Sequence, residues 1–575
     1  MNKLSEIKTR SDLAATLSVS EGDLVKILYY EKDLYQNFDI AKKNGTSRKI
    51  NAPKENLKKI LQTLNILLNK HVHDYYDENN SSLNVSHGFE KGRDIVSNAE
   101  VHINKKFVFN TDIKDFFPSI HFGRVRGLFH KHTIFQMDEY AATMLAQLTC
   151  YNGSLPQGAP TSPLISNLIC RELDIRMLRI CKKFRLHYTR YADDLTFSTN
   201  NKNFQLNYEN FYKKLNNEIN SAGFSLKHNK SRLQQKTERQ EVTGLTVNNK
   251  VNVNRKFYLK TRAMAHSFYE NGSFYINNNI GTMRQLEGRL AFINRLDKEN
   301  NIRKYERLTN EKDKMGFFKH KPLNAREKEY QKFLFYKNFW VRTKPLIITE
   351  GKTDPLYIKA ALKKYYKEYP ELIELNNNND FEFKIDFFNR TSKLRYFFEL
   401  EKDGADTMNR LINYYVHKNY NSKRNDKFNY YHFFHSKMGV PPLYPIVFLF
   451  DNEYEKKPLH KFIDNVAPLT NKPVKTLKKE LNKTNPTPQN LIGNTYILSV
   501  PKSTPNVNGE IEDLLLNITK DLTIKGKKYN KNGGDQYIGK DILSKYIYQE
   551  YESLNLDSLK PLLDRIVNLK IMYEK

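Results

Sequence analysis

The stretch Tyr191-Ala192-Asp193-Asp194 decides how this chain folds and what it can bind. A run that alternates between apolar and polar residues, 186–190, precedes it, and a second β-rich run, 195–198, follows it. This pattern predicts a β-hairpin with two carboxylates at its tip. Adjacent carboxylates repel each other unless a bound divalent cation neutralises them, and Mg²⁺ between carboxylates and substrate phosphates is the first candidate.

An Asp-Asp pair also occurs in ordinary solvated turns, so the neighbouring motifs have to decide. Residues 106–111 read as a strand that ends at Asp112, which places a third carboxylate at a strand end. The sequence LPQGAPTSP at 155–163 is a Pro/Gly loop that leads into a helix at about 164–182. Small residues at such a point let backbone approach a base pair closely. The sequence GFSLKHNK at 223–230 follows the other motifs.

A carboxylate at a strand end, an LPQG loop with its helix, and a YADD hairpin, in this order, resemble the palm of reverse transcriptases. Residues 223–230 look like the next palm motif of that family. Two shorter matches are similar to the retron branch: residues 98–102 fit an NAxxH element, and residues 242–244 fit a VTG triplet. Taken alone, His102 is explained equally well as a structural histidine, and the triplet as the end of an ordinary strand. The resemblance to retrons therefore depends on the position of both matches beside the palm motifs.

The resemblance implies a role for each matching residue. Asp112, Asp193 and Asp194 would hold two Mg²⁺ ions, with help from the backbone carbonyl of Ile113. Phe117 would pack under the sugar and favour dNTPs over NTPs, although an aromatic residue beside a strand is also explained as plain core. Gln157 and Lys230 would contact the incoming nucleotide. Arg93 would contact a phosphate, unless it is a solvated loop arginine. The residues implied in RNA recognition are Asn98, His102, Val242, Thr243 and Gly244.

The composition favours a polyanionic partner. The 575 residues include 94 Lys and Arg against 64 Asp and Glu, a net charge of +30. A bias towards Lys, Asn, Tyr and Ile inflates this charge, but the 36 Tyr and 35 Phe include rings that could stack on bases. The three cysteines have no metal-binding spacing and argue for a reducing compartment. With no apolar signal core or membrane-length apolar run, we expect a soluble, cytoplasmic protein.

A chain of this length predicts several domains. Residues 1 to about 80 are expected to be helical and to begin the fingers. We expect fingers and palm at 1–254, a basic helical thumb at 255–315, a basic connector at 316–340, and a further domain at 341–575.

Two strand ends in this last region carry acidic residues. Residues 344–349 read as a buried strand that ends on Glu350, and a helix follows, which suggests α/β architecture. Residues 444–450 read as another strand, which ends on Asp451-Asn452-Glu453. Side chains at i and i+2 of an extended strand point the same way, so Asp451 and Glu453 could share one cation with Glu350.

This arrangement resembles a Toprim domain, in which the later strand end usually carries Asp-x-Asp, so Glu453 departs from the pattern. Glutamate keeps the charge but adds a methylene, which puts the metal geometry and the activity in doubt. Asp354 could be another ligand, as in Toprim nucleases of the overcoming-lysogenization-defect (OLD) type, or a helix N-cap before Pro355. Glu512 could complete the site or lie on a helix surface. The fold class that we expect is multidomain α+β and α/β: a fingers-palm-thumb polymerase followed by a Toprim nuclease that uses Mg²⁺ or Mn²⁺.

Taken together, the chain looks like a retron reverse transcriptase with a fused Toprim effector. That family implies a structured non-coding RNA (msr-msd) as template, dNTPs as substrates, and single-stranded DNA linked to RNA (msDNA) as product. It also implies antiphage defence, with msDNA and homo-oligomerisation as candidate means of restraining the effector. Two alternatives stay open: another bacterial reverse transcriptase, such as a group II intron enzyme, and a C-terminal module that binds nucleic acid or assembles without catalysis.

Overall fold

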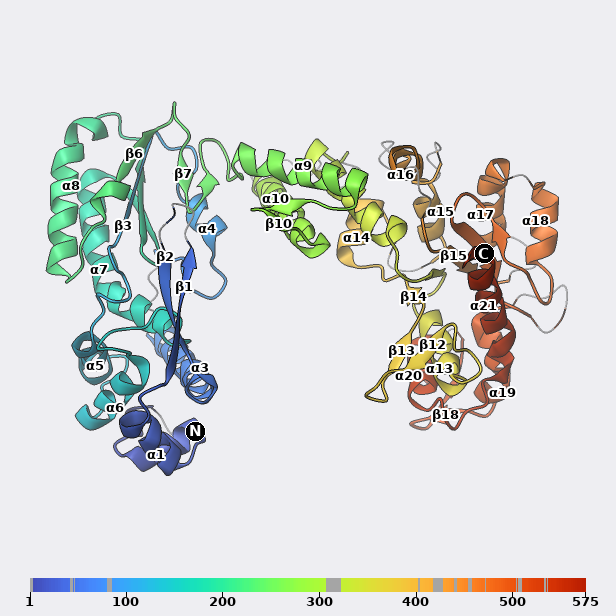
Figure 1. Cartoon of the computed structure of the whole chain (residues 1–575), viewed down its shortest axis with the longest axis horizontal. Helices are drawn as coiled ribbons and strands as arrows, with labels where there is room; N and C mark the ends of the chain where they lie inside the picture. Colours follow the sequence, from blue (N-terminus) through green and yellow to red (C-terminus); the bar gives the residue numbers. More distant parts are fainter. Residues whose placement is uncertain are drawn as a thin grey trace. The chain divides into compact units, whose positions relative to one another are not determined.

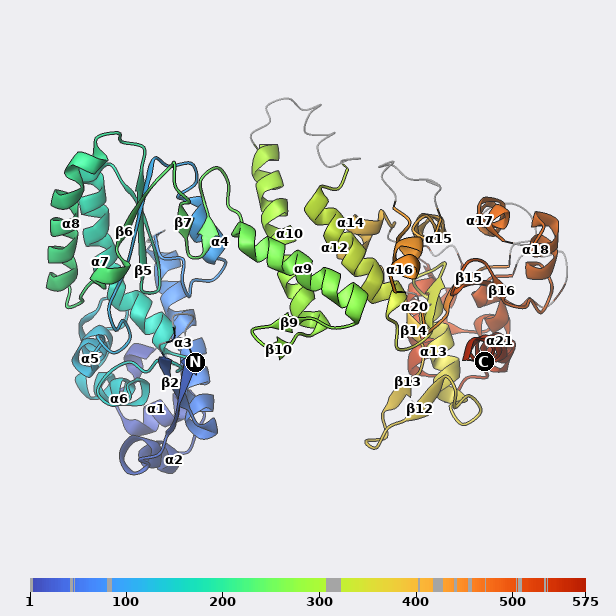
Figure 2. The same cartoon turned by 45° about the horizontal axis from the view of Figure 1, so that its top comes forward.

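The computed structural model describes residues 4–41, 45, 47–79, 85–306, 322–401, 404–416, 428–438, 442–452, 458–470, 472–502, 504, 509–531, 534 and 536–574. It divides into two compact units, Met1–Phe257 and Tyr258–Lys575, called the N-terminal and C-terminal units below (Figures 1 and 2). Among these described residues, no helix has both the length and the apolar character needed to span a bilayer.

The N-terminal unit is built around an antiparallel sheet with the strand order β4-β5-β3-β6. The central strand β3 (Phe107–Asp112) pairs with β5 (Asp194–Thr199) on one side and with β6 (Arg232–Gln235) on the other. Strand β4 (His187–Tyr191) completes the sheet beside β5. Successive side chains of each strand point to opposite faces, so each face has its own set of residues.

Two long helices, α7 (Ser162–Phe184) and α8 (Phe204–Ser221), cover one face of this sheet (Figure 1). Phe109 of β3, Phe197 of β5 and Phe211 of α8 meet there with ring centroids 5.3 to 6.0 Å apart. Each fully buried phenylalanine contributes about 1.5–3 kcal/mol relative to an exposed one. This aromatic packing fixes one face of the sheet and leaves the alternate residues of β3 on the other.

Two hairpins stand apart from the central sheet: β1 (Tyr35–Ala41) with β2 (Ser47–Pro53), and β7 (Glu241–Val242) with β8 (Leu245–Thr246). The expectation of a helical N-terminus is wrong for β1 and β2. The helical segments of the unit are η1 (Leu4–Glu6), α1 (Arg10–Leu17), α2 (Glu21–Val25), η2 (Lys26–Tyr30), α3 (Glu55–Glu78), α4 (Ile95–Glu100), α5 (Phe122–Lys131), α6 (Glu139–Thr149), α7, α8 and η3 (His228–Lys230).

The C-terminal unit contains a five-stranded sheet with the order β14-β11-β15-β17-β16. Strands β11 (Leu346–Thr349), β15 (Ile446–Phe450) and β17 (Thr495–Ser499) are parallel and pair in register. Strand β14 (Asp386–Phe387) adds a parallel edge, and β16 (Gln489–Asn490) adds an antiparallel one. The carboxyl ends of the three central strands therefore lie side by side.

Helices cover both faces of this sheet, as in an α/β domain. Helices α13 (Asp354–Lys364), α20 (Lys540–Gln549) and α21 (Lys560–Glu574) share one hydrophobic core with it. A second core on the other face includes α12 (Ala325–Phe335) and α14 (Ser392–Phe398).

The helices of the predicted thumb, α9 (Arg255–Asn271) and α10 (Met283–Glu306), belong to this second core. Tyr269 of α9 packs against Tyr336 and Phe434, with ring centroids 5.0 and 5.2 Å apart. Glu287 of α10 pairs with Lys337 at 2.6 Å and with Lys393 at 2.9 Å. The predicted thumb and the predicted Toprim region thus form one unit, whereas residues 307–321 lie outside the described residues.

The remaining elements of the C-terminal unit connect these layers. They are β9 (Tyr275–Ile276), β10 (Asn279–Ile280), η4 (Tyr336–Trp340), β12 (Ile373–Leu375), β13 (Phe381–Phe383), α15 (Asp406–Ile412), α16 (Tyr430–Met438), α17 (Pro458–Val466), η5 (Ala467–Leu469), α18 (Val474–Leu481), η6 (Ile511–Leu515), α19 (Leu516–Thr519), β18 (Thr523–Ile524), β19 (Lys527–Tyr529), β20 (Tyr537–Ile538) and η7 (Asp557–Leu559).

Candidate active site

Three carboxylates meet at one end of the N-terminal sheet. Asp112, the last residue of β3, lies opposite Asp194, the first residue of β5. Only Ala192 and Asp193 separate the paired residues of β4 and β5. The backbone N–H of Ile113 donates to the carbonyl of Asp193 at 2.9 Å, which ties the turn to the end of β3. The observed hairpin thus has Asp193 in its turn and Asp194 at its first paired position.

The turn between β4 and β5 is held in a conformation that needs support. Ala192 has a φ of 55°, in the left-handed region, which costs a non-glycine residue roughly 1–3 kcal/mol. Gly88 packs against this turn, and a Cβ atom there would lie 2.6 Å from the backbone nitrogen of Ala192. The N–H of His87 donates to the carbonyl of Arg190, and the N–H of Arg190 donates to the carbonyl of Val85, both at 2.8 Å. The segment around Gly88 therefore runs along β4 without room for a side chain.

The electrostatics of the three carboxylates favour a bound cation. Burial raises the pKa of Asp193 and that of Asp194 above the usual range, and the neighbouring Asp112 raises both further. Lys230 donates from Nζ to Oδ2 of Asp112, and this bond raises the pKa of Lys230. The positive charge of Arg48 on β2 opposes the rise at Asp193. A divalent ion would relieve the repulsion that remains among the three acids.

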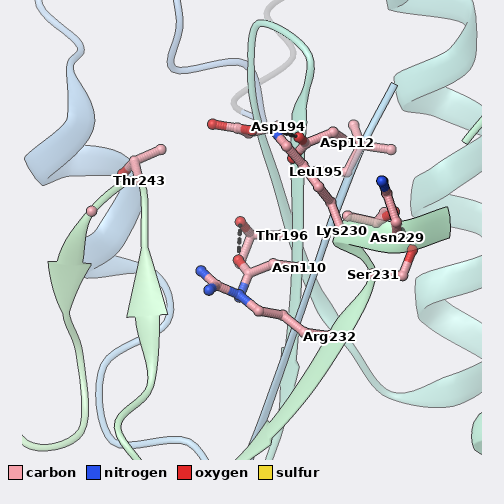
Figure 3. Close-up of a pocket in the computed structure, with 12 residues that line it drawn as sticks. Asn110, Asp112, Asp194, Leu195, Thr196, Asn229, Lys230, Ser231, Arg232 and Thr243 are labelled. Atoms are coloured by element: carbon pink, nitrogen blue, oxygen red, sulfur yellow. Dashed lines mark hydrogen bonds and ion pairs between the residues drawn. The ribbon is translucent and has the colours of Figure 1, made fainter. Parts of the chain in front are cut away.

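A pocket of about 460 Å³ lies beside these carboxylates (Figure 3). Thr196 of β5 donates to Oδ1 of Asn110 of β3 at 3.1 Å, and Thr243 of the β7–β8 turn faces them across the pocket (Figure 3). The lining residues are Asn110, Thr111, Asp112, Asp194, Leu195, Thr196, Asn229, Lys230, Ser231, Arg232, Thr243 and Gly244.

The donor chemistry of this site fits Mg²⁺, which prefers carboxylate oxygens. Among the described residues, no three His, Cys, Asp or Glu side chains are arranged to hold a metal as they stand. One oxygen of Asp112 is engaged by Lys230, so full use of Asp112 as a ligand requires that this bond open. The two-ion site of Asp112, Asp193, Asp194 and the Ile113 carbonyl remains a prediction that these residues fit.

Two of the predicted nucleotide contacts are Gln157, on the loop before α7, and Phe117, on the segment after β3. The carbonyl of Gln157 accepts the N–H of Asn51 of β2 at 2.9 Å. Gly158 has a φ of 140°, and a Cβ atom there would lie 2.7 Å from the carbonyl oxygen of Asn51, so this close approach requires glycine. Phe117 is half-buried, with its ring centroid 6.3 Å from that of Phe89, and part of its ring stays accessible.

Three residues that were assigned to RNA recognition are buried. Asn98, His102 and Val242 are each 0% exposed, so their side chains offer no surface to an RNA. The ring of His102 joins β4 to β5, with Nδ1 2.7 Å from Oγ of Ser198 and Nε2 2.7 Å from Oγ1 of Thr189. Burial lowers the pKa of His102 to about 3. In place of the expected RNA contact, the ring of His102 links two strands of the palm sheet.

Thr243 and Gly244, by contrast, line the pocket. Both have a positive φ, 46° and 83°, and Oγ1 of Thr243 donates to the carbonyl of Ile95 in α4 at 3.2 Å. Arg93 donates from Nη1 to the carbonyl of Ser86 at 2.8 Å, which places its guanidinium on the segment that packs along β4. RNA recognition by Thr243 and Gly244, and phosphate binding by Arg93, remain predictions.

A second group of acids lies in the C-terminal unit, at the carboxyl ends of parallel strands. Glu350 follows β11 and Asp451 follows β15, and these strands are neighbours in register. Asp354 is the first residue of α13, and its Oδ2 accepts the N–H of Gly351 at 2.8 Å. Asp354 therefore closes the turn that begins at Glu350, while Thr353 is the N-cap.

Two further glutamates join this group through a backbone pairing. Asn452 and Gly509 exchange two backbone hydrogen bonds of 2.7 and 2.9 Å, which brings the segment after Gly509 alongside β15. Glu512 is only 4% exposed. Lys540 pairs with Glu510 at 2.9 Å and with Glu512 at 3.1 Å. Glu510 and Glu512 thus lie close enough to Asp451 to act on its charge, and the role of Glu512 as a metal ligand stays a prediction.

Asp451 is the electrostatic centre of the group. Burial raises its pKa well above the usual range, and the nearby acids Asp354, Glu350, Glu510 and Glu512 raise it further. These oxygen donors suit Mg²⁺ or Mn²⁺. Of the five acids that were predicted for this site, Glu453 lies outside the described residues.

Four residues with a clear place at these sites were not predicted: Arg48, Gly88, Arg190 and Glu510. Arg48 lies in a polar hairpin without apolar alternation, and Glu510 depends on a backbone pairing that no local pattern reveals. Gly88 carried a usable signal, because a glycine inside an extended segment often marks a close backbone approach.

Known proteins resemble the N-terminal part of this chain. The family model described as "Reverse transcriptase (RNA-dependent DNA polymerase)" matches residues 40–247. Retron Ec86 reverse transcriptase of Escherichia coli is 34% identical over 39% of this chain and 66% of its own length. Retron Mx65 reverse transcriptase of Myxococcus xanthus is 31% identical over 51% of this chain and 69% of its own length.

Solved structures show only a weak likeness. A telomerase from Candida albicans in complex with a fragment of telomeric RNA has a TM-score of 0.31 and 11% identity, over 54% of this chain and 62% of that chain. A foamy viral protease-reverse transcriptase in complex with double-stranded DNA has a TM-score of 0.27 and 12% identity. The match covers 55% of this chain and 46% of that chain.

Proposed function

Since this chain belongs to the retron reverse transcriptases, we propose that its N-terminal unit copies a structured msr-msd RNA into RNA-linked single-stranded DNA. We further propose that its C-terminal unit is a Toprim-type, metal-dependent nuclease that acts as the effector in antiphage defence in the cytoplasm. The first proposal rests on one observation above all: Asp112 lies opposite Asp194, with Asp193 in the adjoining turn.

Two Mg²⁺ ions bound by these carboxylates would activate the primer hydroxyl and clamp the triphosphate of the incoming dNTP. Asp193 and Asp194 are half-buried carboxylates held on a tied turn, so they would bind ions without large rearrangement. The ammonium group of Lys230 donates to Asp112 and lines the pocket. Once this bond to Asp112 opens, Lys230 could neutralise the pyrophosphate that is released. The partly exposed ring of Phe117 would exclude a ribose 2′-hydroxyl.

The nuclease proposal rests on Glu350 and Asp451, which follow neighbouring parallel strands. Ligands of open α/β sheets bind outside the carboxyl ends of such strands. The acids around Asp451 would hold Mg²⁺ or Mn²⁺ there, and the metal would activate water for attack on a phosphodiester. Lys540 lies between Glu510 and Glu512 and would keep these two carboxylates oriented.

A second candidate function for the C-terminal unit is binding or assembly without catalysis. The observation in its favour is that the described acids are not arranged to hold a metal as they stand. In that case the acids would serve as a structural cluster with Lys540 and Lys531, which pairs with Glu510 at 2.6 Å.

The polymerase proposal is tested by expressing the chain with its native upstream region and extracting the nucleic acid that co-purifies. We expect a discrete single-stranded DNA whose mobility shifts after RNase or a 2′,5′-debranching enzyme. A DNA that neither treatment changes would contradict RNA-linked synthesis, and the absence of DNA would contradict template copying under these conditions.

The nuclease proposal is tested with Glu350→Ala, assayed for metal-dependent cleavage of RNA and DNA and for phage protection. A matched control is Asp541→Asn. This change removes an exposed carboxylate on the neighbouring helix α20, and the carboxylate pairs with Lys352 at 2.9 Å. We expect loss of cleavage and protection in the first variant alone. If cleavage and phage protection both persist in Glu350→Ala, the nuclease proposal is wrong.

A further inference from the structure

A buried arginine lies directly behind the YADD turn. Arg190 belongs to β4, two residues before Ala192, and its side chain is 0% exposed. Its Nε and Nη2 donate to the two carboxylate oxygens of Asp174 on α7, at 2.9 and 2.8 Å. Tyr188 donates to the same carboxylate at 2.8 Å. A buried ion pair is by itself weak evidence of a stability role, so its remaining contacts deserve an explanation.

The third nitrogen of Arg190 connects this pair to the turn. Nη1 donates to the carbonyl oxygen of Ala192 at 3.3 Å and to Oδ1 of Asn167 at 3.0 Å. Asn167 in turn donates from Nδ2 to the carbonyl of Gly88 at 2.9 Å. The guanidinium thus joins α7 to the β4–β5 turn, and Asn167 extends this network to the segment that packs against the turn.

The contact with Ala192 acts on the peptide plane next to Asp193. A peptide unit is planar, so a hydrogen bond to the carbonyl of Ala192 orients the N–H and Cα of Asp193 as well. Ala192 is also the residue with the unfavourable φ of 55°, and such a conformation persists only where its surroundings determine it.

We propose that Arg190 is a positioning residue for DNA synthesis: it orients Asp193 by holding the carbonyl of Ala192, with Asp174 and Asn167 fixing the guanidinium. This inference rests on the polymerase function proposed above. Arg190 touches no substrate in it and acts only through the turn.

The test removes the whole buried pair, so that no charge is left uncompensated. Arg190→Met and Asp174→Leu are combined with Tyr188→Phe, because Tyr188 would otherwise lose its acceptor. Thermal unfolding and primer extension are compared with the unmodified chain. Binding of Mn²⁺ alone, followed by electron paramagnetic resonance, is compared with and without these substitutions in a Glu350→Ala background, which removes the proposed C-terminal metal site from the signal. We expect a folded protein with kcat lower on the order of 10²-fold, unchanged KM for template, and weaker Mn²⁺ binding.

A second variant separates charge from geometry. Arg190→Lys keeps a positive charge against Asp174, but one ammonium group cannot reproduce the planar fork that reaches Asn167 and Ala192. We expect a similar loss of kcat. A matched control is Arg176→Met, which removes a surface ion pair with Glu172 on the same helix and should leave kcat unchanged.

The outcomes are distinct. If the folded triple variant or Arg190→Lys keeps kcat within about twofold of the unmodified chain, together with its Mn²⁺ affinity, the positioning role is wrong. If the unmodified chain makes no DNA, the proposed polymerase function fails, and the Mn²⁺ measurement still decides whether Arg190 orients the carboxylates. A triple variant that does not fold leaves the decision to Arg190→Lys.

Discussion

The N-terminal unit places its carboxylates on antiparallel strands, whereas the C-terminal unit places its acids at the carboxyl ends of parallel strands. In the first, strand pairing sets Asp112 against Asp194, and a tight turn in a costly conformation presents Asp193. In the second, Glu350 and Asp451 directly follow neighbouring strands, and further acids lie near the half-buried Asp451. The first site should therefore be most sensitive to shape, and the second to charge.

The largest expected effects come from removing one carboxylate at each site. Asp193→Asn should lower DNA synthesis at least roughly 10³-fold and leave metal-dependent cleavage intact. Asp451→Asn should abolish metal-dependent cleavage and leave DNA synthesis intact. Both activities are measured on both purified variants. Loss of both activities in either variant, with the fold intact by circular dichroism, would contradict two separate sites.

Shape is tested by adding one methyl group. In Gly88→Ala the new Cβ would lie 2.6 Å from the backbone nitrogen of Ala192, so the turn would have to shift. We expect DNA synthesis to fall roughly 10–100-fold, measured as kcat for primer extension. The control is Gly127→Ala on α5, where an added Cβ meets nothing within 4 Å. Equal activity in the two variants would mean that the turn tolerates displacement.

Charge is tested through the pH dependence of stability. Burial among acids raises the pKa of Asp451 above its usual 3.8, so the folded state holds this proton more tightly than the unfolded state. Its ionisation therefore destabilises the fold at neutral pH, and the penalty fades as pH falls through the raised pKa towards 3.8. In the presence of a chelator, Asp451→Asn should raise Tm at neutral pH and lose this advantage in acid. An advantage that is constant with pH would point to a cause other than titration.

The smallest effect compares one helix of each unit. Gly127→Ala on α5 and Gly288→Ala on α10 both add a Cβ that meets nothing within 4 Å. Each should raise the free energy of unfolding of its own unit by about 0.5–1 kcal/mol, because glycine is a poor helix former. Calorimetry should show Gly288→Ala shifting the transition that also melts the α/β sheet. A separate transition for α9 and α10 would contradict their shared core.

Sequence motifs located the elements of the palm, because each motif combines a strand end with a chemically unusual residue. Asp112 and the YADD turn are such cases. The hairpin of β1 and β2 escaped prediction because its strands are largely exposed and lack an apolar alternation. The sequence of this hairpin has no pattern of buried apolar residues, and backbone pairing between β1 and β2 determines its structure instead.

The remaining site residues depend on long-range contacts. Arg190 looks like any basic residue in the sequence, and only the fold shows that Asp174, sixteen positions earlier, buries it. His102 matched a family element, yet its burial between Ser198 and Thr189 could not be read from its neighbours. Local patterns predict which residues end a strand, whereas packing decides which side chains become accessible.

The shared core of the thumb helices has a consequence for how such chains can be recombined. Tyr269, Leu286 and Leu290 lie in the same core as the parallel sheet, so a cut at residue 316 or 340 would divide one hydrophobic interior. The region that follows either cut is therefore not a self-contained folding unit that could be exchanged. A viable graft would have to carry α9 and α10 with it and join the palm near Phe257, so the two helices would be inherited together with the C-terminal sheet.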